Sequence, residues 1–124
     1  MTNTFKDLLA WQKAYDYCLY VYKVTQDFPD FEKYALRSQY TRAAVSIPAN
    51  IAEGYKKISK ADKLRFFNIA QGSLEECRCY NLLSKDLEYI NEEQFLLLEQ
   101  KINNTSSFLN SYSRSVSENK GITD

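Results

Sequence analysis

The segment from residue 95 to residue 116, FLLLEQKINNTSSFLNSYSRSV, decides the fold class because its apolar positions recur at alternating intervals of three and four residues. These positions are Phe95, Leu98, Ile102, Thr105, Leu109, Tyr112 and Val116. Such a seam follows one side of an α-helix, so it predicts a helix that packs lengthwise against others. The preceding Asn91-Glu92-Glu93-Gln94 has capping-box spacing, which places this helix at about 92–117.

Three further helices are predicted upstream, at about 8–26, 31–55 and 60–87. Asp7 is the expected N-cap of the first helix, and Asp30 caps the second after the break at Pro29. Ser59 and Asp62 have capping-box spacing at the start of the third. Four long helices with short loops give an all-α, up-down-up-down antiparallel four-helix bundle. We expect one domain over residues 1–117 and a disordered tail over 118–124.

The composition excludes most catalytic chemistry. The 124 residues include 16 basic and 16 acidic side chains and no histidine. Without histidine there is no Ser-His or Cys-His pair and no imidazole ligand for a metal. We therefore expect no catalytic residue, no cofactor and no metal site. The alternative, a carboxylate-metal enzyme built in the bundle core, normally uses Glu-x-x-His pairs.

The three cysteines, Cys18, Cys77 and Cys79, are an odd number, which excludes a full disulfide framework. We interpret them as small apolar fillers in a reducing compartment, with a metal or redox role as the alternative. The sequence contains neither an N-terminal apolar signal core nor an apolar run of membrane-spanning length. The prediction is a cytoplasmic protein without a membrane partner.

A polar stripe is expected along the second helix. At 100° per residue its members fall on one narrow arc, and they are Gln39, Arg42, Ser46, Asn50 and Glu53. Short polar side chains are poor residues for a helix interior, so we predict a buried or interfacial hydrogen-bond network; a solvated face is the alternative. The third helix offers partners for it in Ser73, Glu75 and Glu76, with Arg42 paired to one of the two glutamates.

Two residues in these helices break the usual helix preferences. Pro48 lies inside the stripe, and because the polar register continues across it we predict one kinked helix rather than two. Gly72 lies inside the third helix, where it predicts the close approach of another backbone.

The charge is unevenly distributed along the chain. From residue 33 to residue 65 the charged side chains are mostly basic, and from 75 to 99 mostly acidic. Five basic residues around the second interhelical turn are candidate phosphate contacts: Lys56, Lys57, Lys60, Lys63 and Arg65. The alternative for them is a solvated loop, since a net charge of zero argues against a dedicated nucleic-acid binder.

Three segments resemble a bacterial family of small proteins encoded in intervening sequences of 23S ribosomal RNA genes. They are the opening Phe5-x-Asp7-Leu8-x-x-Trp11-Gln12-Lys13-Ala14, the block from Arg42 to Gly54, and the block from Ala70 to Glu76. The resemblance implies a four-helix protomer in a ring-shaped homopentamer, with no established catalytic activity. It also implies kinship with the accessory protein of diversity-generating retroelements, which binds reverse transcriptase and nucleic acid.

The sequence therefore supports three hypotheses. The first is a non-enzymatic homo-oligomeric scaffold or adaptor, a pentamer by resemblance, that contacts RNA, DNA or a partner protein. Its first helix carries apolar and aromatic side chains around most of its circumference, which one neighbouring helix cannot cover. The alternatives are a monomeric bundle that binds only a protein partner, and the carboxylate-metal enzyme.

Overall fold

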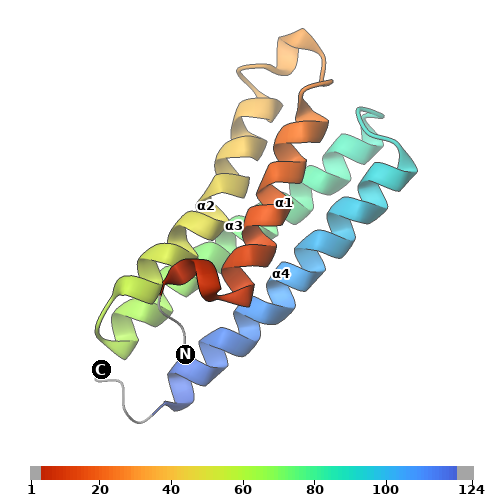
Figure 1. Cartoon of the computed structure of the whole chain (residues 1–124). Helices are drawn as coiled ribbons and strands as arrows, with labels where there is room; N and C mark the ends of the chain where they lie inside the picture. The colour runs from red at the N-terminus through yellow and green to blue at the C-terminus, as the bar shows by residue number, and fades with distance from the viewer. Residues whose placement is uncertain (1–3, 120–124) are drawn as a thin grey trace.

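A computed structural model describes residues 4–119, in which four long helices lie side by side (Figure 1). The helices are α1 (Leu9–Thr25), α2 (Leu36–Lys56), α3 (Lys60–Asp86) and α4 (Glu92–Glu118). Two short 3-10 helices, η1 (Phe5–Asp7) and η2 (Asp30–Glu32), precede α1 and α2. The α1–α2 and α3–α4 connections lie at one end of the molecule and the α2–α3 turn at the other (Figure 1). The predicted all-α, up-down bundle is confirmed for the described residues.

The core lies along the middle of the bundle, because α1 and α3 each pack against α2 and α4. The seam predicted for α4 faces this core. Leu98, Ile102, Thr105, Leu109 and Val116 are buried, and Phe95 and Tyr112 are half-buried at its edges.

Helix starts follow local capping chemistry. Asn91 accepts a hydrogen bond from the backbone N–H of Gln94, whose side chain accepts from Asn91 N–H, so the predicted capping box of α4 is confirmed. Ser59 caps α3 by accepting from Asp62 N–H at 3.1 Å. Asp7 does not cap α1: Asp7 belongs to a capping box with Thr4 that starts η1, and Leu8 precedes α1.

The start of the second helix differs from the prediction. The chain forms η2 at 30–32 and enters α2 only at Leu36, five residues later than expected. Asp30 is the first residue of η2 rather than a cap. Glu32 supplies the missing partner, since its carboxylate accepts from Leu36 N–H at 3.2 Å. Phe31 and Tyr34 stay exposed, so no apolar burial extends the helix backwards through them.

The remaining boundaries agree closely with the prediction. α2 continues through Pro48, which confirms one helix rather than two. α3 ends in a Schellman-type turn, in which Tyr89 N–H donates to Ser84 C=O and Glu88 N–H to Lys85 C=O. Glu88 occupies the left-handed position of this turn at φ 62°, where glycine is usual. α4 reaches Glu118, and residues 120–124 of the predicted tail lie outside the described residues.

Candidate functional site

A polar groove of about 390 Å³ runs between α2 and α3 and is lined by five of the eight residues of the predicted polar network. Its lining residues are Gln39, Arg42, Ala43, Ser46, Ser73, Glu76 and Tyr80. Ser73 Oγ donates to Ser46 Oγ at 2.8 Å, which joins the two helices. Asn50 Nδ2 donates to the backbone oxygen of Ser46 at 2.8 Å and to its Oγ at 2.9 Å. The small polar residues of the stripe therefore form hydrogen bonds with one another.

The larger polar residues of the predicted network point outward in the single chain. Gln39, Arg42, Glu53, Glu75 and Glu76 are all exposed, so a network buried within one protomer does not form at these positions. The predicted pairing of Arg42 with a glutamate is not found: among residues 4–119 Arg42 makes no ion pair, while Glu75 binds Arg78 at 3.2 Å. The interfacial alternative stays a prediction.

Tyr80 closes one end of the groove. Its hydroxyl lies 3.2 Å from Glu76 Oε2 and 3.4 Å from Gln39 Oε1. Desolvation raises the pKa of Tyr80, and the hydrogen bond to the Glu76 carboxylate raises it further. The phenol therefore stays a neutral donor in this groove at physiological pH.

The close approach of helices is at Gly54 rather than Gly72. A Cβ built on Gly54 would lie 2.5 Å from Cε1 of Phe67, whose ring is buried in the core. A Cβ on Gly72 would meet nothing within 4 Å. The prediction for Gly72 is wrong within the single chain, because this part of α3 faces outward.

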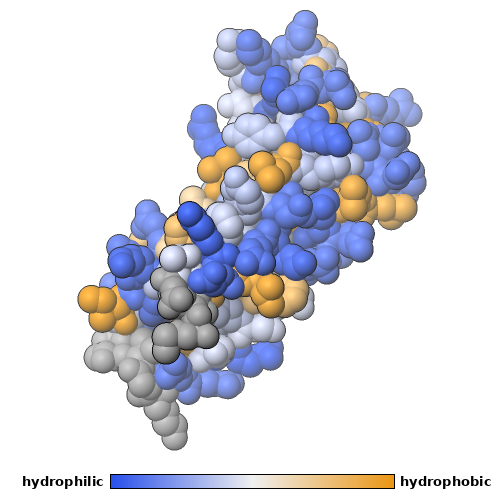
Figure 2. Space-filling model, in the orientation of Figure 1, coloured by the Kyte–Doolittle hydropathy of each residue, from blue (hydrophilic) through white to orange (hydrophobic). Residues whose placement is uncertain are grey.

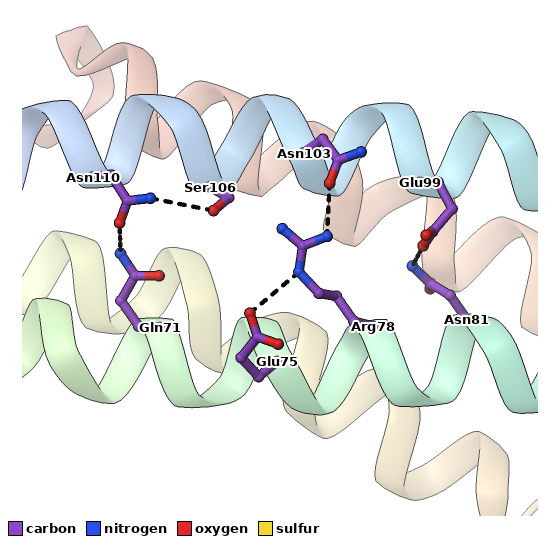
Figure 3. Close-up of polar contacts among 8 residues, drawn as sticks. All are labelled: Gln71, Glu75, Arg78, Asn81, Glu99, Asn103, Ser106 and Asn110. Atoms are coloured by element: carbon purple, nitrogen blue, oxygen red, sulfur yellow. Dashed lines mark hydrogen bonds and ion pairs between the residues drawn. The ribbon is translucent and has the colours of Figure 1, made fainter.

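The surface where α3 meets α4 is polar and its groups are paired with each other (Figure 3). Gln71 Nε2 donates to Asn110 Oδ1 at 2.5 Å. Arg78 Nη1 donates to Asn103 Oδ1 at 2.6 Å, while Arg78 Nε binds Glu75. These contacts join α3 to α4 at two points along the seam, while Ser113 Oγ of α4 is buried there without a hydrogen-bond partner among the described residues.

A buried polar cluster joins all four helices and was missed by the sequence analysis. Asn81 Oδ1 on α3 accepts from Tyr17 OH of α1 at 2.7 Å and also from Tyr40 OH of α2. Asn81 Nδ2 donates to Glu99 Oε2 of α4 at 3.0 Å (Figure 3). Burial raises the pKa of both tyrosines, so both hydroxyls remain donors. The only sequence signal was an asparagine at a core position of α3.

The cysteines divide into two environments. Cys18 and Cys77 are buried, as predicted for apolar fillers, and desolvation raises their pKa values to about 11 and about 12. Cys79 is exposed, so the filler interpretation is wrong for this residue. Within residues 4–119 no group of three His, Cys, Asp or Glu side chains is placed to hold a metal ion. Nor is any helix there long and apolar enough to cross a membrane.

The basic residues of the α2–α3 turn have different structural roles. Lys63 Nζ donates to the carbonyl of Tyr55 at 2.7 Å and approaches that of Gly54 at 3.5 Å, and desolvation lowers its pKa. It thus caps the negative end of α2 and is not a free phosphate contact. Lys57 and Arg65 lie over the ring of Phe66, at 5.1 and 4.6 Å from its centroid. Lys56 is exposed beside them, and Lys60 begins α3.

Exposed hydrophobic side chains lie on every long helix, most of them on α1, α2 and α3, and the connections also expose Phe31, Tyr34, Ile58 and Leu87. On these three helices they are Leu9, Tyr15, Leu19 and Tyr22 on α1, Val45 on α2, and Ile69, Leu82 and Leu83 on α3. α4 exposes Leu96. On the face drawn in Figure 2 the hydrophobic residues form separate patches within a largely hydrophilic surface. A hollow of about 330 Å³ where Tyr22 meets Arg42 and Val45 connects the α1 side chains to the polar stripe.

Comparisons with known proteins agree on one family. The family model described as 23S rRNA-intervening sequence protein matches residues 6–111. A crystal structure of a protein of unknown function from the S23 ribosomal protein family of Bacteroides thetaiotaomicron superposes with a TM-score of 0.78. That protein is 23% identical, and the alignment covers 86% of this chain and 99% of that one, so the likeness establishes the shared fold. No curated protein matches the chain significantly.

Proposed function

The chain belongs to the 23S rRNA-intervening sequence protein family, and from this membership we propose that it is a non-enzymatic, homo-oligomeric scaffold. The observation that carries the proposal is the uneven distribution of unpartnered side chains over the bundle. Hydrophobic residues are exposed on α1, α2 and α3, whereas polar side chains bind one another across the α3–α4 seam. A second copy of the chain would cover these exposed hydrophobic residues.

Two different surfaces take part in the proposed contact. The α1 edge, defined here as Tyr15, Leu19 and Tyr22, lies on one side of α2. The α2–α3 groove, with the unpaired guanidinium of Arg42 at its rim, lies on the other. When the α1 edge of one copy docks on the groove of the next, the same rotation is repeated at each step; a ring forms when these rotations add up to a full turn, and an open filament forms when they do not. The number five rests on the family resemblance.

Gly72 and Arg42 gain a role in such a contact. An exposed glycine inside a helix costs about 1 kcal/mol relative to alanine, and nothing within the protomer compensates for it. A helix of the neighbouring copy that crosses close to Gly72 would offset this cost. Arg42 would then pair with an acceptor of that copy.

The mass of the particle tests the proposal. Size-exclusion chromatography with light scattering is expected to give about five times the protomer mass of 14.5 kDa. Leu19→Glu should dissociate the particle, because it places a charge in the α1 edge. Leu96→Glu is the matched control: Leu19 is 54% exposed and Leu96 58%, but Leu96 lies on α4. A monomeric parent protein, or equal dissociation by both variants, would overturn the proposal.

The scaffold is also proposed to contact nucleic acid through the α2–α3 turn. Lys56 and Arg65 are exposed there, and Lys57 is half-buried beside them, which gives a local positive potential despite the neutral chain. A gel-shift titration should detect binding at low salt and its loss as salt increases. Absence of binding at low salt would remove this part of the proposal and leave the oligomer untouched.

A further inference from the structure

A hollow lies beside this basic turn, between η1 and the C-terminal half of α2. Its volume is about 450 Å³, and its lining residues are Thr4, Phe5, Ala52, Glu53, Tyr55 and Lys56. This volume is in the range of small-molecule sites. The hollow therefore has room for a ligand group, and the chemistry of its lining residues indicates what kind of group it can bind.

The η1 wall of the hollow is held in place by local contacts. Thr4 Oγ1 accepts from Lys6 N–H at 3.1 Å, and Gln12 Nε2 donates to the Lys6 carbonyl at 2.8 Å. The Phe5 ring meets the edge of Trp11 at a centroid distance of 5.0 Å, and Trp11 stacks on Tyr15 at 4.7 Å. The aromatic wall is thus preformed, which lowers the entropy that a ligand must lose on binding.

The walls combine an aromatic surface with two opposite charges. Phe5 and Ala52 supply apolar surface, and because Lys63 Nζ lies 5.6 Å from the centroid of the Tyr55 ring, Phe5 is the ring offered for stacking. Glu53 and Lys56 carry a carboxylate and an ammonium group, and neither pairs with another side chain among residues 4–119. A stacking surface, a hydrogen-bond acceptor and a cation match the three chemical parts of a nucleotide: the base face, its N–H edge and its phosphate.

The neighbouring turn has no comparable stacking surface. Lys57 and Arg65 both lie over the Phe66 ring, so the turn offers cations for phosphates but no free ring for a base. The hollow, which shares Lys56 with the turn, supplies that surface. A single strand that crosses the turn can therefore place one base in the hollow, whereas the bases of a duplex stay paired and stacked.

We propose that this hollow binds one unpaired nucleobase of single-stranded nucleic acid, which stacks on Phe5 while its Watson–Crick edge donates to Glu53 and its phosphate meets Lys56. Because a carboxylate only accepts hydrogen bonds, the preferred base carries adjacent N–H donors, as guanine does. This inference rests on the proposed nucleic-acid contact at the α2–α3 turn, and it adds strand type and base preference to it.

Trp11 is the only tryptophan of the chain and touches Phe5, so its fluorescence reports on the hollow. We would titrate the full chain with an RNA oligonucleotide of alternating G and U, with an all-U strand of equal length, and with a duplex. The expected result is a change in Trp11 emission with the G-containing strand, a Kd lower by about 10-fold than for all-U, and no emission change with duplex.

Three variants separate the pocket from the turn. Glu53→Gln should abolish the preference for G while the salt dependence of binding stays. Lys56→Ala with Lys57→Ala should weaken all strands and reduce the salt slope by roughly 1 to 2. Lys33→Ala, which removes one positive charge at the opposite end of the bundle, should change neither. Gel shifts without any change in Trp11 emission, or equal binding of duplex, would overturn the proposal that the hollow binds a base. The proposed nucleic-acid contact at the α2–α3 turn would then still stand. No binding of any strand would overturn both. Because Tyr15 of the α1 edge stacks on Trp11, assembly alone can change Trp11 emission, so every titration is made at one fixed protein concentration.

Discussion

Replacement of Asn81 by leucine should destabilise the bundle although the new side chain is apolar and similar in size. Asn81 is fully buried, and its Oδ1 is the acceptor for both Tyr17 OH and Tyr40 OH. In Asn81→Leu both hydroxyls remain in the core without a partner. The expected result is a lower free energy of unfolding, because two buried hydroxyls lose their acceptor.

The magnitude follows from two opposing contributions. An unsatisfied buried hydroxyl costs about 1 to 3 kcal/mol, so the two together cost about 4 kcal/mol. Burial of a leucine side chain returns about 2 kcal/mol, which leaves a net loss of about 2 kcal/mol. With a urea m-value of about 1 to 3 kcal/mol per M, the unfolding midpoint should fall by roughly 1 M.

The triple variant Tyr17→Phe, Tyr40→Phe, Asn81→Leu is the matched control. It removes both hydroxyl donors together with their acceptor, and Glu99, which loses the Asn81 donor, is only half-buried and can bind water instead, so the stability should return to within about 1 kcal/mol of the parent protein. Urea unfolding followed by circular dichroism at fixed protein concentration measures all three proteins. The reasoning is refuted if Asn81→Leu is as stable as the parent, or if the triple variant is no more stable than the single one.

Three further predictions concern other parts of the fold. Gly54→Ala should cost about 1 to 3 kcal/mol in thermal or urea unfolding, because its Cβ would overlap the buried ring of Phe67; an unchanged midpoint would contradict the close approach. Glu88→Gly should raise the free energy of unfolding by about 1 kcal/mol, since it relieves the left-handed backbone at φ 62°, and a loss of stability would argue against that strain. The contribution of the Cys77 thiol to stability should be constant below about pH 9 and be lost between about pH 9 and 12. Burial raises the pKa of Cys77 from 9.0 to about 12, so the unfolded chain loses this proton first; urea midpoints measured against pH should fall less steeply in Cys77→Ala.

The tertiary structure decided most of the candidate site. The polar stripe was predictable as a stripe, but only packing against α3 shows that Ser46 meets Ser73 while Arg42 stays exposed. Lys63 looked like its basic neighbours in the sequence, and its role as a cap depends on the carbonyl of Tyr55, eight residues away on another helix. The hollow at Phe5 likewise arises because η1 folds back onto the end of α2.

The sequence by itself determined the four helices and the side of α4 that faces the core. Helix periodicity and capping link residues three or four positions apart, so the Phe95–Val116 seam and the Asn91 capping box could be predicted from neighbours alone. The Asn81 cluster could not, because Tyr17 and Asn81 are 64 residues apart in the chain. Their contact exists only once all four helices are packed. Before the packing is known, any polar residue on the other helices is an equally good candidate for the partner of Asn81.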